Sequence, residues 1–129
     1  MSQYNNTRNL KIKPVFTVGA ENAGAGTINV AIQLLNRDNG NEIAEAVGMF
    51  WYLSSDSAGQ AIATAHSGGC AIGTDGFLIE WTANLSGLVI SEADGDIDIT
   101  FTEAGALTTY LNLVAPDGKV YTSGAITHA

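Results

Sequence analysis

The sequence is poor in cysteine, proline and basic residues, with one, two and five of them among 129 residues. A single cysteine cannot form a disulfide within the chain, so burial and hydrogen bonds must stabilise the fold. No apolar run is long enough for a transmembrane helix, and residues 1–14 lack the apolar stretch of a signal peptide. We therefore expect a soluble protein that does not enter a membrane and is made in a reducing compartment.

Positive charge is scarce and unevenly placed. Thirteen acidic residues against five basic ones give a net charge of -8, and such a surface repels nucleic acids and anionic membranes. Three of the basic residues, Arg8, Lys11 and Lys13, lie in the first fourteen residues, which contain no acidic residue. We expect residues 1–14 to form an extended basic arm that contacts an acidic partner or a neighbouring copy. The alternative is a frayed, solvated terminus.

Apolar residues are abundant and alternate with polar ones. They make up 46% of the chain, against 14% charged residues, which is typical of one globular domain. The alternation over residues 27–34 and 96–102 predicts half-buried antiparallel strands. Their inward residues are Ile28, Val30, Ile32, Leu34, Ile97, Ile99 and Phe101. Further strands are expected at residues 15–18, 47–53, 77–82, 88–90, 109–114 and 120–123.

Turn signals separate these segments. Asn or Asp precedes Gly at Gly40, Gly76, Gly95 and Gly118, and such pairs favour tight chain reversals. Short strands between frequent turns are typical of a sandwich or barrel. The sequence therefore predicts an all-β fold, a single antiparallel β-sandwich over residues 15–129.

The candidate catalytic and metal-binding residues are few. His66 and Cys70 are four residues apart, but the sequence indicates no third group that would orient them, so we expect no enzyme activity. Asp94, Asp96 and Asp98 could offer oxygen ligands to Ca²⁺ at a turn. Because the alternation turns Asp96 and Asp98 outward, a solvated strand face is the favoured interpretation. We expect neither a metal nor another cofactor.

Two aromatic segments favour different interpretations. If Met49 and Trp51 point inward, Phe50 and Tyr52 form an exposed pair, which indicates contact with another protein. The alternative is that another part of the same chain covers them.

The second aromatic segment contains Phe77, Ile79 and Trp81, which alternate with Leu78 and Glu80. Alternation of this kind is also found in a strand buried in the core. We predict a core strand here.

Residues 29–34, 38–41 and 45–50 (NVAIQL, DNGN and EAVGMF), together with residues 92–101, resemble the bacterial immunoglobulin-like domains of the invasin and intimin type. The resemblance implies an Ig-like sandwich, with a jelly-roll-like sandwich as the second choice. Trp51 would then be the buried tryptophan of the central strand.

The whole chain also resembles small structural proteins of tailed-bacteriophage virions. The resemblance is carried by VFTVGAE at residues 15–21, the small residues after it, and SGAIT at residues 123–127. It implies a capsid decoration or cement protein, made in the host cytoplasm and assembled in several copies on the capsid exterior. Its partner would be the major capsid protein or another virion protein. The uneven charge and the two-faced strand predict that the contact residues are Arg8, Lys11, Lys13, Phe50 and Tyr52. The alternative is an Ig-like adhesion module of a phage tail or bacterial surface that binds a receptor or carbohydrate.

Overall fold

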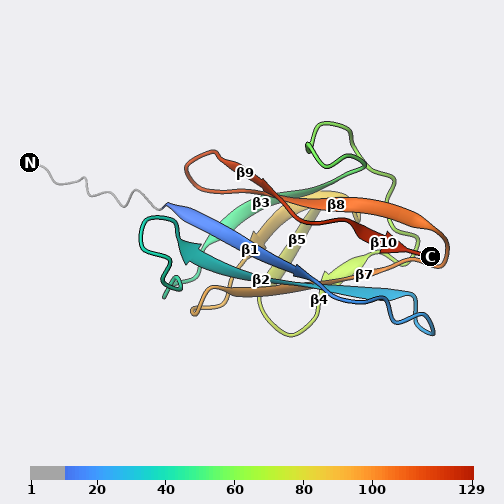
Figure 1. Ribbon diagram of the computed structural model, residues 1–129, viewed down its shortest axis with the longest axis horizontal. Coiled ribbons are helices and arrows are strands. Elements are labelled where there is room, and N and C mark those ends of the chain that lie inside the picture. The colour runs from blue at the N-terminus through green and yellow to red at the C-terminus, as the bar shows by residue number, and fades with distance from the viewer. Residues whose placement is uncertain (1–10) are drawn as a thin grey trace, which may run out of the picture.

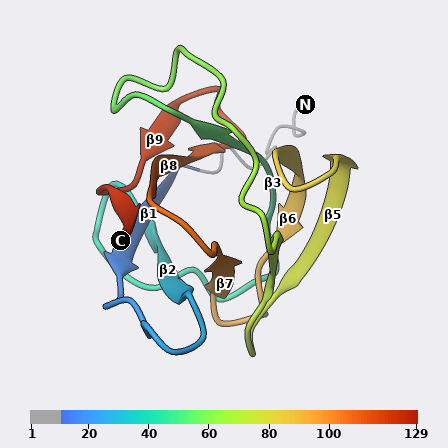
Figure 2. The same ribbon diagram turned by 90° about the vertical axis from the view of Figure 1, so that its right-hand side faces the viewer.

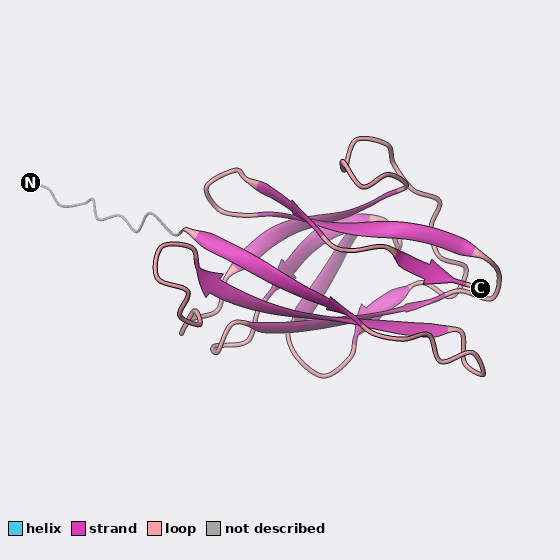
Figure 3. Ribbon diagram, viewed as in Figure 1, coloured by secondary structure: helices cyan, strands magenta, loops and turns pink. Residues whose placement is uncertain are grey.

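The computed structural model describes residues 11–129, which form ten β-strands joined by turns and loops (Figure 1, Figure 3). The strands are β1 Ile12–Val18, β2 Thr27–Asn36, β3 Gly48–Ser54, β4 Cys70–Ile72, β5 Phe77–Thr82, β6 Ser86–Ile90, β7 Asp96–Thr102, β8 Leu107–Val114, β9 Val120–Thr122 and β10 Ile126–His128. Over this range the chain has no helix that is long and apolar enough to cross a membrane.

The strands form two antiparallel sheets that pack face to face (Figure 2). The first sheet has the order β1-β2-β7-β4. The second has the order β10-β8-β3-β6-β5. Both β9 and β10 pair with β8: β10 with its residues 107–109 and β9 with its residues 112–114. The predicted all-β antiparallel sandwich is confirmed.

The strand order corresponds to that of an immunoglobulin-like sandwich, in which strands A, B, E and D face strands C, F and G. Here β1, β2, β7 and β4 form the first of these sheets, and β3, β8 and the pair β9 and β10 form the second. The strands β6 and β5 extend the second sheet beyond β3, where variable-type domains also carry additional strands. In this chain they follow β4 in sequence, so the chain crosses between the sheets before it returns at β7.

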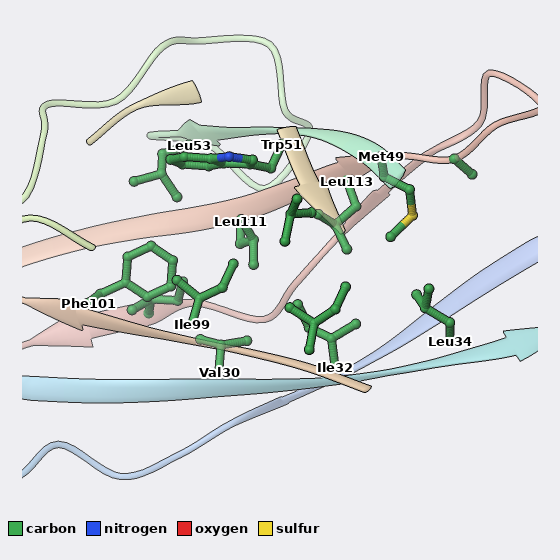
Figure 4. Packing of buried hydrophobic residues seen from close by; sticks show 14 of the residues in the cluster. Val30, Ile32, Leu34, Met49, Trp51, Leu53, Ile99, Phe101, Leu111 and Leu113 are labelled. Atoms are coloured by element: carbon green, nitrogen blue, oxygen red, sulfur yellow. The ribbon is translucent and has the colours of Figure 1, made fainter. Parts of the chain in front are cut away.

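The core lies between the two sheets, and both contribute alternating side chains (Figure 4). From the first sheet come Ile28, Val30, Ile32, Leu34, Ile97, Ile99 and Phe101, all at most 2% exposed. From the second come Met49, Trp51, Leu53, Leu111 and Leu113, with the same low exposure. The inward residues predicted for residues 27–34 and 96–102 are therefore confirmed.

The first strand begins earlier than the sequence predicted. Ile12 pairs with Asn36 of β2 and is fully buried, and Pro14 is buried as well. The expected boundary between arm and domain, at residues 14 and 15, therefore has to move to a point before Ile12, because this side chain belongs to the core. The strands β4 and β10, of three residues each, were not predicted.

Candidate protein-binding face

The outer face of the second sheet carries large apolar side chains on three neighbouring strands. Because Met49 and Trp51 on β3 and Val89 on β6 point into the core, their neighbours in sequence point outward. The pairing of β5 with β6 extends this outward face to the sheet edge. We call the group the aromatic face, and it comprises Phe50, Phe77, Ile79, Trp81, Leu88 and Ile90.

The prediction that Phe77, Ile79 and Trp81 belong to the core was wrong. Phe77 is 59% exposed and Trp81 62%. Their strand β5 is the last of the second sheet and pairs only with β6 (Figure 2). Leu78, on the opposite side of the strand, packs against the core. The residues of β5 do alternate between two faces, but the larger side chains lie on the solvent side.

One row of paired apolar residues crosses five strands of this sheet. In order, the paired residues are Ile79 of β5, Leu88 of β6, Phe50 of β3, Val114 of β8 and Val120 of β9. A groove of about 340 Å³ follows Phe50, Leu88 and Val114. A continuous, uncharged apolar row on a monomer's surface is typical of a site that contacts another protein.

Two rings of the aromatic face are held in place by each other. The ring centroids of Phe50 and Trp81 are 5.3 Å apart, and the ring planes are inclined by 57°. Ring pairs of this geometry contribute about 0.5–1.5 kcal/mol. The contact links β3 to β5 across β6, so the two rings are already ordered before a partner binds, which lowers the entropy cost of association.

Phe50 and Tyr52 both point outward, as predicted, but only Phe50 is exposed, at 53%. The Tyr52 hydroxyl donates a hydrogen bond of 2.8 Å to the carbonyl oxygen of Gly59, which lies in the connection between β3 and β4. Gly59 has a φ of +71°, and a Cβ there would lie 2.6 Å from Oδ1 of Asn112. Only glycine permits this close approach. The alternative of cover by the same chain thus applies to Tyr52.

Of the basic residues predicted to bind a partner, Lys11 and Lys13 lie in the described part of the chain, whereas Arg8 lies outside it. Lys11 Nζ is 3.4 Å from Oδ2 of Asp38 in the same chain. Lys13 is exposed on β1, where it pairs with Leu35 of β2. One of the two described charges is therefore partly neutralised within the chain.

Asp98 serves the chain's own turn between β4 and β5. It accepts hydrogen bonds from the backbone N–H groups of Thr74 and Asp75, at 2.8 and 2.6 Å, and from Nδ2 of Asn29 at 2.9 Å. Burial by itself would raise the pKa of Asp98, but these hydrogen bonds outweigh it and lower that pKa below its ordinary value. The carboxylate is therefore largely satisfied by protein donors.

The other residues of the acidic turn also contact the chain itself. Oδ1 of Asp94 accepts a hydrogen bond of 3.2 Å from the backbone N–H of Asp96. Partial burial raises the pKa of Asp96, and the carboxylates of Asp94, Asp75 and Glu42 add to the effect. Throughout residues 11–129, no group of three or more His, Cys, Asp or Glu side chains could hold a metal ion.

The two residues considered for catalysis have separate environments. Burial, with a smaller contribution from Glu80, raises the pKa of Cys70 to about 12. A thiol with that pKa is protonated at neutral pH and is a poor nucleophile. His66 Nε2 instead lies 2.8 Å from Oγ1 of Thr109 on β8.

His66 and His128 are both buried, at 2% and 1% exposure, and their rings meet edge to face with centroids 5.1 Å apart. The His66 ring also contacts Phe101 at 5.2 Å. Neither Nδ1 atom has a hydrogen-bond partner among the described residues. Burial, and secondarily His128, lowers the pKa of His66 to about 4, so the ring is neutral at physiological pH.

This burial predicts a loss of stability in acid. The free energy of unfolding should fall as the pH drops from 6.5 towards 4, because unfolded His66 binds a proton at 6.5 and the folded form only at about 4. The loss in the free energy of unfolding should reach roughly 2–3 kcal/mol near pH 4 and be absent above about pH 7. Urea unfolding at a series of pH values measures it.

The matched variant is His66→Gln, which keeps a group for Thr109 but cannot be protonated, and it should flatten this pH dependence. Hydrogen bonds from Ser67 lower the pKa of Glu103 from 4.5 to about 2, so the stability that Glu103 contributes is lost between about pH 4.5 and 2, mostly below this range. An undiminished pH dependence in His66→Gln would show that another group is responsible.

Comparison with solved structures supports the fold. The chain is similar to residues 27–141 of a conjugate transposon protein from Bacteroides vulgatus, whose structure was determined in solution by NMR. The TM-score is 0.52 at 12% sequence identity, and the match covers 99% of this chain and 91% of the other. At this identity the similarity shows the sandwich fold alone. No family model matches the chain, and no curated protein matches it.

Proposed function

We propose that this chain is a non-enzymatic structural protein of a tailed-phage virion that decorates the capsid exterior and binds the major capsid protein. The observation that carries the proposal is the aromatic face, with Phe50, Phe77 and Trp81 each more than half exposed. Large aromatic side chains are enriched among the residues that dominate protein–protein binding energies. The virion context comes from the resemblance of residues 15–21 and 123–127 to such proteins.

Binding would stabilise the capsid by removing apolar surface from water. Phe50 would be the central anchor, since it lies in the row that crosses the sheet and its ring contacts that of Trp81. Each contact can be modest, because a lattice that displays many copies raises the overall attachment. The net charge of -8 keeps the free protein dispersed before it binds.

The proposal predicts that Phe50→Ser weakens attachment to phage heads at least about tenfold. The purified chain would be mixed with empty heads assembled from the major capsid protein encoded in the same genome, and bound protein quantified after sedimentation. Because the Phe50 ring is 53% exposed and points away from the core, the variant should remain folded, which circular dichroism would verify.

Val15→Ser is the matched control, because Val15 is 41% exposed but lies on β1 of the other sheet. It should bind heads like the wild type. If both variants lost binding equally, the aromatic face would not be the binding site. Failure of the wild type to bind heads would contradict the virion role.

The exposure of Trp81 favours a second candidate, a carbohydrate- or receptor-binding module of a phage tail or bacterial surface. At 62% exposure the indole could stack on the apolar face of a sugar ring. In that case soluble glycans should change the tryptophan fluorescence of the chain, and Trp81→Ala should abolish the change while head binding is absent.

A further inference from the structure

The edge strands of the two sheets differ in their protection against pairing with another chain. β1 carries Lys13 and Pro14, and both residue types hinder strand addition at an exposed edge. β4, β9 and β10 have only three residues each. β5 has six residues, none of them Lys or Pro. The features that protect it are the register shift between Glu80 and Thr82 and the inward-facing Glu80, both towards one end of the strand. Among the edge strands within residues 11–129, β5 is thus the one that has more than three residues and carries neither Lys nor Pro.

The side of the sandwich that β5 borders is also the open one. A groove of about 270 Å³ runs between β4 and β5 and is lined by apolar side chains that include Ile72 and Leu78. The opposite side is closed by Ile12 and Ile126, both fully buried. In Figure 2, β5 stands at the outer margin of the molecule. A partner that adds to β5 would cover both the strand edge and this groove.

We propose that the occupant of this edge is a second copy of the chain, paired antiparallel through β5 about a two-fold axis at Ile79. The second sheets of the two copies would then form one continuous sheet. The inference rests on the proposed function, because it identifies a partner for the same part of the molecule.

The backbone of β5 is suited to this register. The carbonyl oxygen of Ile79 accepts a hydrogen bond of 3.2 Å from Nε1 of Trp51 and so faces its own sandwich. Successive residues of a strand direct their N–H and C=O groups to opposite edges, so those of Leu78 and Glu80 face the open edge. In the proposed register Leu78 exchanges two hydrogen bonds with Glu80 of the second copy. Ile79 meets Ile79 of the second copy in a non-hydrogen-bonded pair.

The side chains fit the same register. Phe77 lies opposite Trp81 of the second copy, once on each side of the axis, and aromatic pairs of this kind stabilise antiparallel strands. At 59% and 62% exposure, these two rings present roughly 250 Å² per copy, or roughly 500 Å² for the four rings. Stable interfaces begin near 1,200 Å² in total. Ile79, at 37% exposure, the two backbone edges and the groove lining add to this area.

The charge pattern permits two copies of a protein of charge -8 to meet here. Glu80 is the one charged residue of β5. Its Oε1 accepts a hydrogen bond of 2.6 Å from the backbone N–H of Asn84 in its own chain. In the proposed register it lies opposite Leu78, so no two carboxylates face each other across the axis.

Pairing at the edge buries Phe77 and Trp81 between the two copies but leaves Phe50 and the row from Leu88 to Val120 free. Phe50 and Val120 of both copies would lie on the same side of the continuous sheet, so the dimer would present two such faces to a common partner. Bivalent contact of this kind strengthens attachment without any new type of contact.

Sedimentation of the full chain over a concentration series should show a species of twice 13.4 kDa. Ile79→Lys, which places two ammonium groups opposite each other, should raise the dimer dissociation constant at least about tenfold. Ile62→Lys is the matched control, since Ile62 is 74% exposed and lies in the connection between β3 and β4. It should dimerise like the wild type. A wild-type chain that stays monomeric at every concentration would overturn the proposal.

Cross-linking tests the register itself. In a Cys70→Ser background, Ile79→Cys should form a disulfide-linked dimer on oxidation, because the Cα atoms of a non-hydrogen-bonded pair lie about 4.5 Å apart, within disulfide range. Ile62→Cys should not. Equal cross-linking of both variants, or of neither, would contradict the register. A monomeric chain that still binds heads would refute the dimer alone, whereas a dimer that binds no heads would refute the proposed function alone.

Discussion

Replacing Trp51 by alanine should lower the free energy of unfolding by about 3–5 kcal/mol. Trp51 is 1% exposed and is among the largest side chains of the core, where it packs between the sheets (Figure 4). Its removal leaves a cavity that the neighbouring strands can fill only in part. It also removes the hydrogen bond from Nε1 to the carbonyl oxygen of Ile79, which ties β3 to β5.

Chemical denaturation followed by circular dichroism measures this loss. The control is Phe50→Ala at the next position of the same strand, which removes a ring that is 53% exposed. It should cost less than about 1.5 kcal/mol, mostly through its contact with Trp81. Similar losses in both variants would contradict the burial of Trp51 and the exposure of Phe50 on opposite faces of β3.

Gly87→Ala should destabilise the protein by about 3 kcal/mol, at the upper end of the cost of overpacking. A Cβ at Gly87 would overlap the carbonyl oxygen of Ile79 and lie 2.9 Å from Cα of Glu80. These are backbone atoms, so relief requires β5 to move away from β6. Amide hydrogen exchange should therefore become faster in Phe77–Thr82 than in the remainder of the second sheet.

Gly48→Ala is the matched control for this variant. Gly48 lies on β3, and a Cβ there would meet only side-chain atoms of Ile90 and Leu88 at 3.8 Å, which is ordinary contact. The control should keep wild-type stability or gain slightly, since alanine restricts the unfolded chain more than glycine does. If both variants behave alike, the close approach of β5 to Gly87 is incorrect.

The strands that the sequence predicted most clearly are those whose alternation is longest. Over residues 27–34 of β2 and over β7 every second residue is apolar, and the structure buries all of those side chains. The turns at Gly40, Gly76, Gly95 and Gly118 all have positive φ, as expected from the Asn or Asp that precedes each glycine. By contrast, β4 and β10 are too short for any period, and only their pairing with β7 and β8 makes them strands.

The candidate site was predicted in part. The sequence of β3 correctly indicated that Phe50 points outward. The residues on either side of it, Met49 and Trp51, are more suitable for the core, and they are buried there. The contributions of Phe77 and Trp81 were missed. A strand at the sheet edge and one at its centre can share the same alternation, and sequence does not show which face a second layer will cover.

The sequence by itself determined the all-β class, the inward residues of the long strands and the position of the turns, because these depend on alternation and on local backbone preference. The tertiary structure alone decided that β5 ends the second sheet, that the connection between β3 and β4 covers Tyr52, and that Ile12 closes one side of the core. Those outcomes depend on which strands become neighbours. Strand neighbours are chosen by packing between residues far apart in the chain, and a local pattern does not encode that choice.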